Sequence, residues 1–185
     1  MRILVTYFSE TGNTKKVAEA IAGAAEAEAY EVVVCSLQDV NPESLQGFDM
    51  VFVGSTCHSS DIAAPVKEWV DHIPTRATLR LAGFVTHSTM MPEGAAWKRE
   101  MYERWAGKCL GTFEHLCASK GFGFLGFFHC QGAPSPEIET FIRSNIIPDE
   151  AQWNEYIDEA RLHPTPADLE AACEFARRVV VEFQA

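Results

Sequence analysis

The sequence predicts an α/β fold in which helices cover both faces of a doubly wound, five-stranded parallel sheet. Two observations carry this prediction. Short apolar runs of strand length alternate with longer segments whose apolar residues recur at helical spacing. Strands joined by such helices form right-handed crossovers, which give a parallel sheet with three layers, α/β/α. Five strands of this kind fit the order 2-1-3-4-5, and 185 residues suit a single domain over residues 1–185.

Each expected element has a local reason. The apolar runs place five strands at residues 3–8, 32–35, 50–53, 84–86 and 124–130. Helices are expected at residues 14–28, from Pro65, at 108–120 and from Pro166. Val17, Ile21 and Ala24 form the apolar face of the first helix. Pro65 and Pro166 suit the first turn of a helix, where a missing N–H costs little.

Two helical insertions exceed the minimal version of this fold. Residues 89–107 follow the fourth strand and residues 132–164 follow the fifth. The first insertion carries large apolar residues at four-residue spacing: Trp97, Met101 and Trp105. The second is expected to form two short helices, one starting at Ser135-Pro136 and one near Asp149.

The composition excludes several classes of protein. The formal net charge is -11, so the surface repels nucleic acid and anionic membranes, and neither is expected as a partner. The apolar run at the N-terminus is too short for a signal peptide or a membrane span. The six cysteines are scattered and form no C-x-x-C pair, which is typical of free thiols in a reducing compartment. A cytoplasmic protein is therefore predicted.

The most specific motif lies between the first strand and the first helix. It consists of Ser9, Glu10, Thr11, Gly12, Asn13 and Thr14. Backbone N–H groups at a helix start have no partner within the helix, and the helix dipole favours an anion there. The hydroxyls of Ser9, Thr11 and Thr14 add donors, and Gly12 permits close approach. The loop lacks both the P-loop pattern and the three glycines of a dinucleotide fingerprint, so it favours a terminal phosphate. The alternative is a hydroxyl-rich helix cap without a ligand.

This motif resembles the S/T-x-T-G-x-T signature of the flavodoxin family and matches it in full. The resemblance covers residues 1 to about 131 and the last helix, and it leaves the two insertions outside. It implies a flavodoxin-like fold with FMN at the carboxyl edge of the sheet. The phosphate would lie in the first loop, and the flavin ring between the loops after strands three and four.

Those two loops complete the predicted FMN-binding residues: Ser55, Thr56, Cys57, His58, Thr86, His87, Ser88 and Thr89. Ligands bind at this edge of open α/β sheets because helix starts converge where the strand order reverses. Flavodoxins commonly place an aromatic from each loop against the ring, but neither loop here contains Trp, Tyr or Phe. The predicted substitutes are His58, Met90 or a Trp97 that folds back from the first insertion.

Cysteine and histidine side chains are expected to meet on these loops. Cys57, His58 and His87 lack an evident fourth ligand, so no metal site is predicted. A Cys57 thiol beside a flavin would be redox-active if its pKa were lowered. Cys109 and Cys117 lie on the apolar face of their helix and are expected in the core.

Three functions remain open. The first is a low-potential electron carrier, in which FMN supplies the redox chemistry, no catalytic residue is needed and the acidic surface attracts redox partner proteins with basic surfaces. The second is an FMN-dependent reductase with its own small substrate, such as a quinone. In that reading His58 or His87 donates a proton, and the insertions wall a pocket with Trp97, Trp105, Phe141 and Trp153. The third is a redox-inactive module that binds a partner protein. The oligomeric state stays open.

Overall fold

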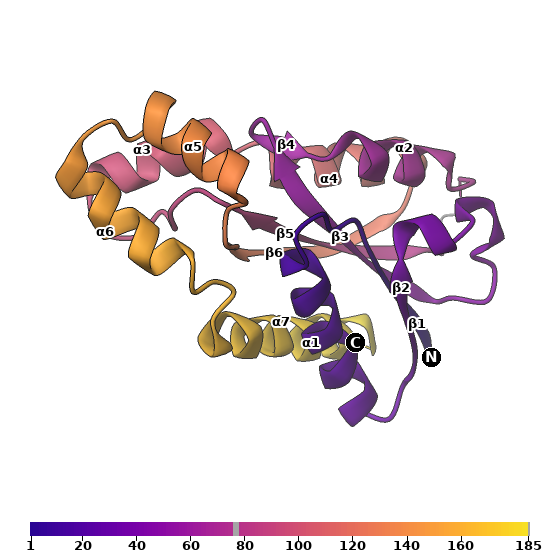
Figure 1. The fold of residues 1–185 in the computed structure, drawn as a ribbon. Coiled ribbons are helices and arrows are strands. Elements are labelled where there is room, and N and C mark those ends of the chain that lie inside the picture. Colours follow the sequence, from indigo (N-terminus) through magenta and orange to yellow (C-terminus); the bar gives the residue numbers. More distant parts are fainter. Residues whose placement is uncertain (76–77, 185) are drawn as a thin grey trace.

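Five parallel strands form the middle layer of the molecule, as the computed structural model of residues 1–75 and 78–184 shows (Figure 1). In chain order the strands are β1 (Arg2–Tyr7), β2 (Glu31–Ser36), β3 (Met50–His58), β4 (Asp61–Ile62), β5 (Arg80–His87) and β6 (Gly123–Gln131). The parallel order is β2-β1-β3-β5-β6, and β4 pairs antiparallel with β3 off this path. This confirms the predicted order 2-1-3-4-5, because the unpredicted two-residue strand β4 only shifts the numbering.

The expected helices are present, including those of both insertions. They are α1 (Asn13–Ala27), α2 (Ala64–His72), α3 (Ala96–Trp105), α4 (Cys109–Lys120), α5 (Pro136–Asn145), α6 (Glu150–Ala160) and α7 (Pro166–Gln184), with short 3-10 helices η1 (Leu37–Asp39) and η2 (Pro42–Ser44). Side-chain caps explain several of the starts. Ser135 Oγ accepts a hydrogen bond from the N–H of Ile138, and Asp149 Oδ1 accepts one from that of Gln152. None of the helices in the described ranges has the length and apolar character that a membrane span requires.

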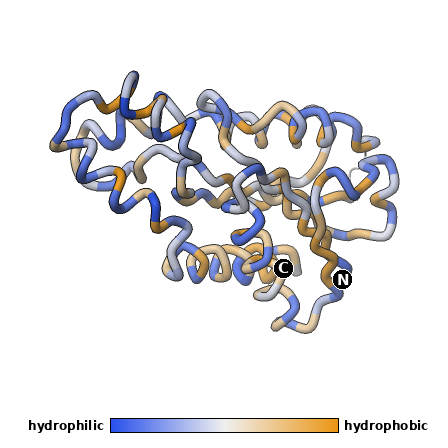
Figure 2. The backbone as a smooth tube through the Cα atoms, in the orientation of Figure 1, coloured by the Kyte–Doolittle hydropathy of each residue, from blue (hydrophilic) through white to orange (hydrophobic). Residues whose placement is uncertain are grey.

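Helices cover both faces of the sheet and enclose two cores. Ile3 and Val5 of β1 pack toward α1 and α7, whereas Leu4 packs toward α2 and α4. This alternation follows from the two-residue side-chain period of a strand. Hydrophobic residues accordingly gather along the strands and on the inner faces of the helices (Figure 2).

The insertions lie together beyond the carboxyl ends of the strands (Figure 1). They have a small core of their own, which includes Met90, Ile142, Ile147 and Tyr156. The Tyr156 hydroxyl donates to the carbonyl of Ser88 at 2.6 Å, so α6 is joined directly to the segment after β5.

The segment after the third predicted strand differs from the expectation. Residues Ser55 to His58 were predicted as loop, but they continue β3, which then turns back into β4. Ser59 and Ser60 form the turn with φ of 50° and 79°. Two central residues with positive φ are typical of a two-residue β-hairpin, where Asn-Gly is the usual sequence. Thr86 and His87 likewise end strand β5 and do not lie in the loop that follows it.

Candidate functional site

A cavity of about 690 Å³ opens at the carboxyl edge of the sheet. It is lined by most of the predicted cofactor-binding residues: Glu10, Thr11, Asn13, Thr56, Cys57, His58, Thr86, His87, Ser88 and Thr89. The remaining four, Ser9, Gly12, Thr14 and Ser55, are not part of its lining. The structure therefore brings the three predicted segments to one place, as expected for a parallel sheet whose strand order reverses between β1 and β3.

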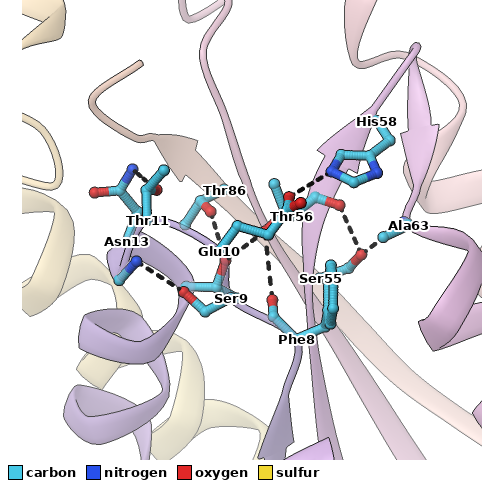
Figure 3. A network of polar contacts seen from close by, with 12 residues as sticks. Phe8, Ser9, Glu10, Thr11, Asn13, Ser55, Thr56, His58, Ala63 and Thr86 are labelled. Carbon is cyan, nitrogen blue, oxygen red and sulfur yellow. Dashed lines mark hydrogen bonds and ion pairs between the residues drawn. The ribbon is translucent and has the colours of Figure 1, made fainter. Parts of the chain in front are cut away.

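The loop before α1 is held by its own side chains (Figure 3). Gly12 has φ of 89°, in the left-handed region, and directs the chain into the first helical turn. Ser9 Oγ accepts hydrogen bonds from the N–H groups of Gly12 at 3.2 Å and Lys15 at 3.3 Å. Ser9 thus fixes the backbone of the loop without lining the cavity, whereas Glu10 and Thr11 do line it.

Asn13 ties this loop to the segment after β6. Its Nδ2 donates to Thr11 Oγ1 at 3.0 Å and to the carbonyl of Ala133 at 2.8 Å. The two segments approach so closely that a Cβ on Gly132 would lie 2.9 Å from Asn13 Nδ2. Gly132 and Ala133 also line the cavity, and the sequence offered no local signal for that role.

The hydroxyl of Thr14, which was predicted to donate to the phosphate, faces the sheet. It is fully buried and lies 2.8 Å from Thr86 Oγ1 and 3.4 Å from Thr56 Oγ1. Thr56 Oγ1 donates to the carbonyl of Phe8 at 3.4 Å. This group of hydroxyls joins α1, β3 and β5 beneath the loop, and the backbone N–H of Thr14 lies in the first turn of α1, where N–H groups lack internal acceptors.

Ser55 also has a structural contact where a ligand contact was predicted. Its buried Oγ donates to the carbonyl of Thr56 at 2.7 Å and accepts from the N–H of Ala63 at 2.9 Å (Figure 3). Ala63 directly precedes α2, so Ser55 fixes the chain at the start of that helix.

Glu10 and His58 meet across the rim of the cavity. Glu10 Oε2 lies 2.6 Å from His58 Nε2, and both side chains are about half exposed (Figure 3). The contact joins the loop before α1 to the end of β3. His58 lines the cavity at the end of β3, in the segment where the family resemblance leads one to expect an aromatic residue, and Met90, which follows β5, lines it as well.

His87 is held as a neutral imidazole. Its Nδ1 lies 3.1 Å from the carbonyl of Thr89, which can only accept, so Nδ1 carries the proton and Nε2 accepts from Nδ1 of His129 at 3.0 Å. Burial, helped by the neighbouring His129, lowers the pKa of His87 to about 3. His87 was predicted as a possible proton donor, but a group with this pKa is not protonated at neutral pH.

The insertions supply an apolar wall to the cavity. Trp105 of α3 and Phe141 of α5 meet edge to face with ring centroids 5.9 Å apart. Both line the cavity as predicted, whereas Trp97 and Trp153 pack against the core of the insertions instead. Sequence reasoning did not assign the other members of the wall to the cavity: Met101, Ile138, Ile142, Ile146, Ile147 and Tyr156. Ile138 and Ile142 lie four residues apart in α5, and this helical spacing was the available signal for them.

A family model described as a flavodoxin domain matches residues 4–177. The chain belongs to the flavodoxin family. Solved structures with this fold include a flavodoxin from the domain Archaea, with 17% identity over 100% of both chains and a TM-score of 0.65. Oxidised Flavodoxin 2 from Bacillus cereus has 18% identity over 98% of this chain and 99% of its own, with a TM-score of 0.62. Rubredoxin oxygen:oxidoreductase from Desulfovibrio gigas has 14% identity over 99% of this chain and 36% of its own, with a TM-score of 0.65.

Membership of the flavodoxin family implies a flavin cofactor, and the cavity offers a suitable donor set for one. A helix start with a positive-φ glycine borders one end, and the ends of β3 and β5 border the middle. A volume of about 690 Å³ lies within the usual range of cofactor and ligand sites. Within the described ranges, no group of three or more His, Cys, Asp or Glu side chains is arranged to hold a metal ion.

Proposed function

We propose that this flavodoxin-family protein binds FMN in the cavity and carries electrons at low potential. The supporting observation is the path of the cavity, which begins at the start of α1 and continues between the ends of β3 and β5. The N–H groups at the start of a helix are suited to a phosphate because they lack internal acceptors and lie at the positive end of the dipole. FMN, when bound, supplies the electron transfer.

The residues of the chain bind and orient the cofactor in this proposal. Backbone N–H groups of Glu10, Thr11 and Asn13 surround the phosphate, and His58 and Met90 contact the ring. The net charge of -11 disfavours the further negative charge that reduction brings, which favours a low potential. The same charge favours redox partner proteins with basic surfaces. We propose a cytoplasmic location on the evidence of six free cysteines.

Two glycines provide a matched test of the phosphate site. Gly12 and Gly94 both have φ of 89°, and a Cβ on either would meet nothing within 4 Å. Gly12→Ala and Gly94→Ala therefore add similar backbone strain, about 1–2 kcal/mol. We expect Gly12→Ala alone to weaken FMN binding in a fluorescence titration, since Gly12 sets the start of α1 beside the proposed phosphate, whereas Gly94 lies in the first insertion, before α3. Equal FMN affinities in the two variants would contradict the proposed phosphate site.

Anaerobic reductive titration then tests the carrier function. Accumulation of a one-electron reduced flavin would show that the protein separates the two electron transfers, as a carrier requires. Direct two-electron reduction would contradict the carrier proposal. Purified protein that cannot be reconstituted with FMN would instead favour a redox-inactive module that binds a partner.

The apolar wall favours a second candidate function, an FMN-dependent reductase with a small apolar substrate such as a quinone. Ile138 and Phe141 line the cavity and remain 43% and 44% exposed, so apolar surface is available beside the proposed ring site. Reoxidation of the reduced protein by quinones in stopped-flow experiments tests this candidate. Saturation with quinone concentration would support it, and a linear dependence would contradict a dedicated substrate site.

A further inference from the structure

Two cysteines meet at the wall of the cavity. Cys57 lies near the end of β3 and Cys109 is the first residue of α4. Their Sγ atoms are 3.7 Å apart although 52 positions separate them in the sequence. A disulfide needs a separation of about 2.0 Å, so the sulfurs have to approach by roughly 1.7 Å. The structure describes both as free thiols, together with the other four cysteines.

The two thiols differ in their access to the cavity. Cys57 is partly exposed and lines the cavity, whereas Cys109 is 1% exposed and lies behind it. A small molecule in the cavity therefore reaches Cys57 first. This is the arrangement of an attacking cysteine and a resolving cysteine.

The contact between the two sulfurs favours the thiolate at Cys57, whereas the Cys57 thiol itself donates to the carbonyl of Trp105 at 3.3 Å. The Cys109 thiol donates to Cys57 Sγ and lies 3.8 Å from the carbonyl of Ser60. The hydrogen bond from Cys109 lowers the pKa of Cys57, although burial and Asp61 act in the opposite direction. The same contact, together with burial, raises the pKa of Cys109.

The other cysteines show the opposite tendency. Burial raises the pKa of each of the remaining four thiols: Cys35, Cys117, Cys130 and Cys173. Thiolates, not thiols, attack disulfides. Cys57 is thus distinguished from the other cysteines both by its place on the cavity wall and by its chemistry.

We propose that Cys57 and Cys109 form a reversible dithiol–disulfide centre that reacts with low-molecular-weight disulfides entering the cavity. Cys57 loses its proton to solvent, and its Sγ attacks one sulfur of the small disulfide. A mixed disulfide forms, and the first small thiolate leaves and takes up a proton. The Cys109 thiol then loses its proton and attacks Cys57 Sγ, which expels the second small thiolate, and that thiolate is protonated in turn. The two protein thiols are oxidised by two electrons, and one small disulfide is reduced to two thiols.

Glutathione disulfide tests this centre on the full-length protein without FMN, so the result does not depend on the proposed cofactor. The reduced protein is equilibrated with glutathione buffers of increasing oxidation, quenched with acid, and alkylated after denaturation. We expect the six free cysteines to fall by two, with a peptide map that joins Cys57 to Cys109. Return to a reducing buffer should restore both thiols. A protein that keeps all its thiols, retains bound glutathione, or joins another pair would overturn the proposal.

Single variants separate the two roles. Cys109→Ala should stop at a mixed disulfide, with one glutathione bound at Cys57, because no resolving thiol is present. Cys57→Ser should lose the reaction at both positions. Cys117→Ala is the matched control, since Cys117 lies on the same helix and is equally buried at 1%. It should close the disulfide as the unmodified chain does. If disulfide formation at Cys57 required Cys117, or if it persisted in Cys109→Ala, Cys109 would not be the resolving cysteine.

Discussion

Replacing Gly132 with alanine places a Cβ against the side chain of Asn13. The new atom would lie 2.9 Å from Nδ2, 3.0 Å from Cβ and 3.1 Å from Cγ of Asn13. Gly132 does not have the left-handed backbone conformation, so crowding and not strain sets the cost. Overpacking of this kind costs about 1–3 kcal/mol. We expect the Gly132→Ala variant to lose that amount of unfolding free energy and to bind FMN more weakly, because Asn13 orients the proposed phosphate loop.

The partner substitution Asn13→Gly removes all three crowded atoms. It also removes the hydrogen bonds to Thr11 and Ala133 and has a cost of its own, about 1–3 kcal/mol. In that background Gly132→Ala should cost almost nothing. Urea unfolding of the four proteins without FMN, followed by circular dichroism, gives the coupling free energy of the double-mutant cycle. Equal costs of Gly132→Ala in both backgrounds, to within about 0.5 kcal/mol, would refute the proposed crowding.

Three further outcomes are expected. Because the folded protein holds His87 neutral with a pKa of about 3 and the unfolded chain titrates near 6.5, its stability should fall by up to about 1.4 kcal/mol per pH unit as the pH drops from 6.5 toward 3. Urea unfolding at a series of pH values should show a weaker dependence of the unfolding free energy on pH in His87→Gln. The same pH dependence in both proteins would contradict the neutral, buried state of His87. Tyr156→Phe should lose about 0.5–1.5 kcal/mol with the hydrogen bond to Ser88, seen as a lower melting temperature, whereas an unchanged melting temperature would mean that this bond does not hold α6. Phe141→Ala should change stability by less than about 1 kcal/mol because the side chain is 44% exposed. It should raise the KM for quinones if the apolar wall binds them, and an unchanged KM would show that Phe141 does not contact the substrate.

Local patterns were sufficient to predict most of the fold. The alternation of Ile3, Leu4 and Val5 between the two cores follows directly from the strand period. The helices of the second insertion were predictable because Ser135 and Asp149 cap them with their own side chains. These signals lie within a few residues of the feature that they determine.

The hairpin of β3 and β4 was missed for a physical reason. Its turn uses Ser59 and Ser60 at positive φ, where glycine or asparagine would have been the recognisable signal. The expected loop from Ser55 to His58 therefore became strand. In a similar way, helical spacing predicted an apolar face with Trp97 and Trp105 but could not indicate which of them would meet the cavity.

Contacts between distant segments left no trace in the single sequence. His87 and His129 are neighbours because β5 and β6 pair in parallel, with Val85 opposite His129. Cys109 was correctly expected to be buried, but its contact with Cys57 depends on where α4 starts relative to the end of β3. Such pairs are set by tertiary packing, which periodicity does not describe.

The threonine hydroxyls beneath the first loop form a chain with a fixed polarity. A hydroxyl has one proton, and Thr56 uses its own on the carbonyl of Phe8. Thr14 must therefore donate to Thr56, and Thr86 must donate to Thr14. Every donor in the chain points from β5 toward β1. A Thr86→Val change would leave the buried Thr14 oxygen without its donor, so the hydroxyl beneath the first loop depends for its hydrogen bond on a residue two strands away from β1.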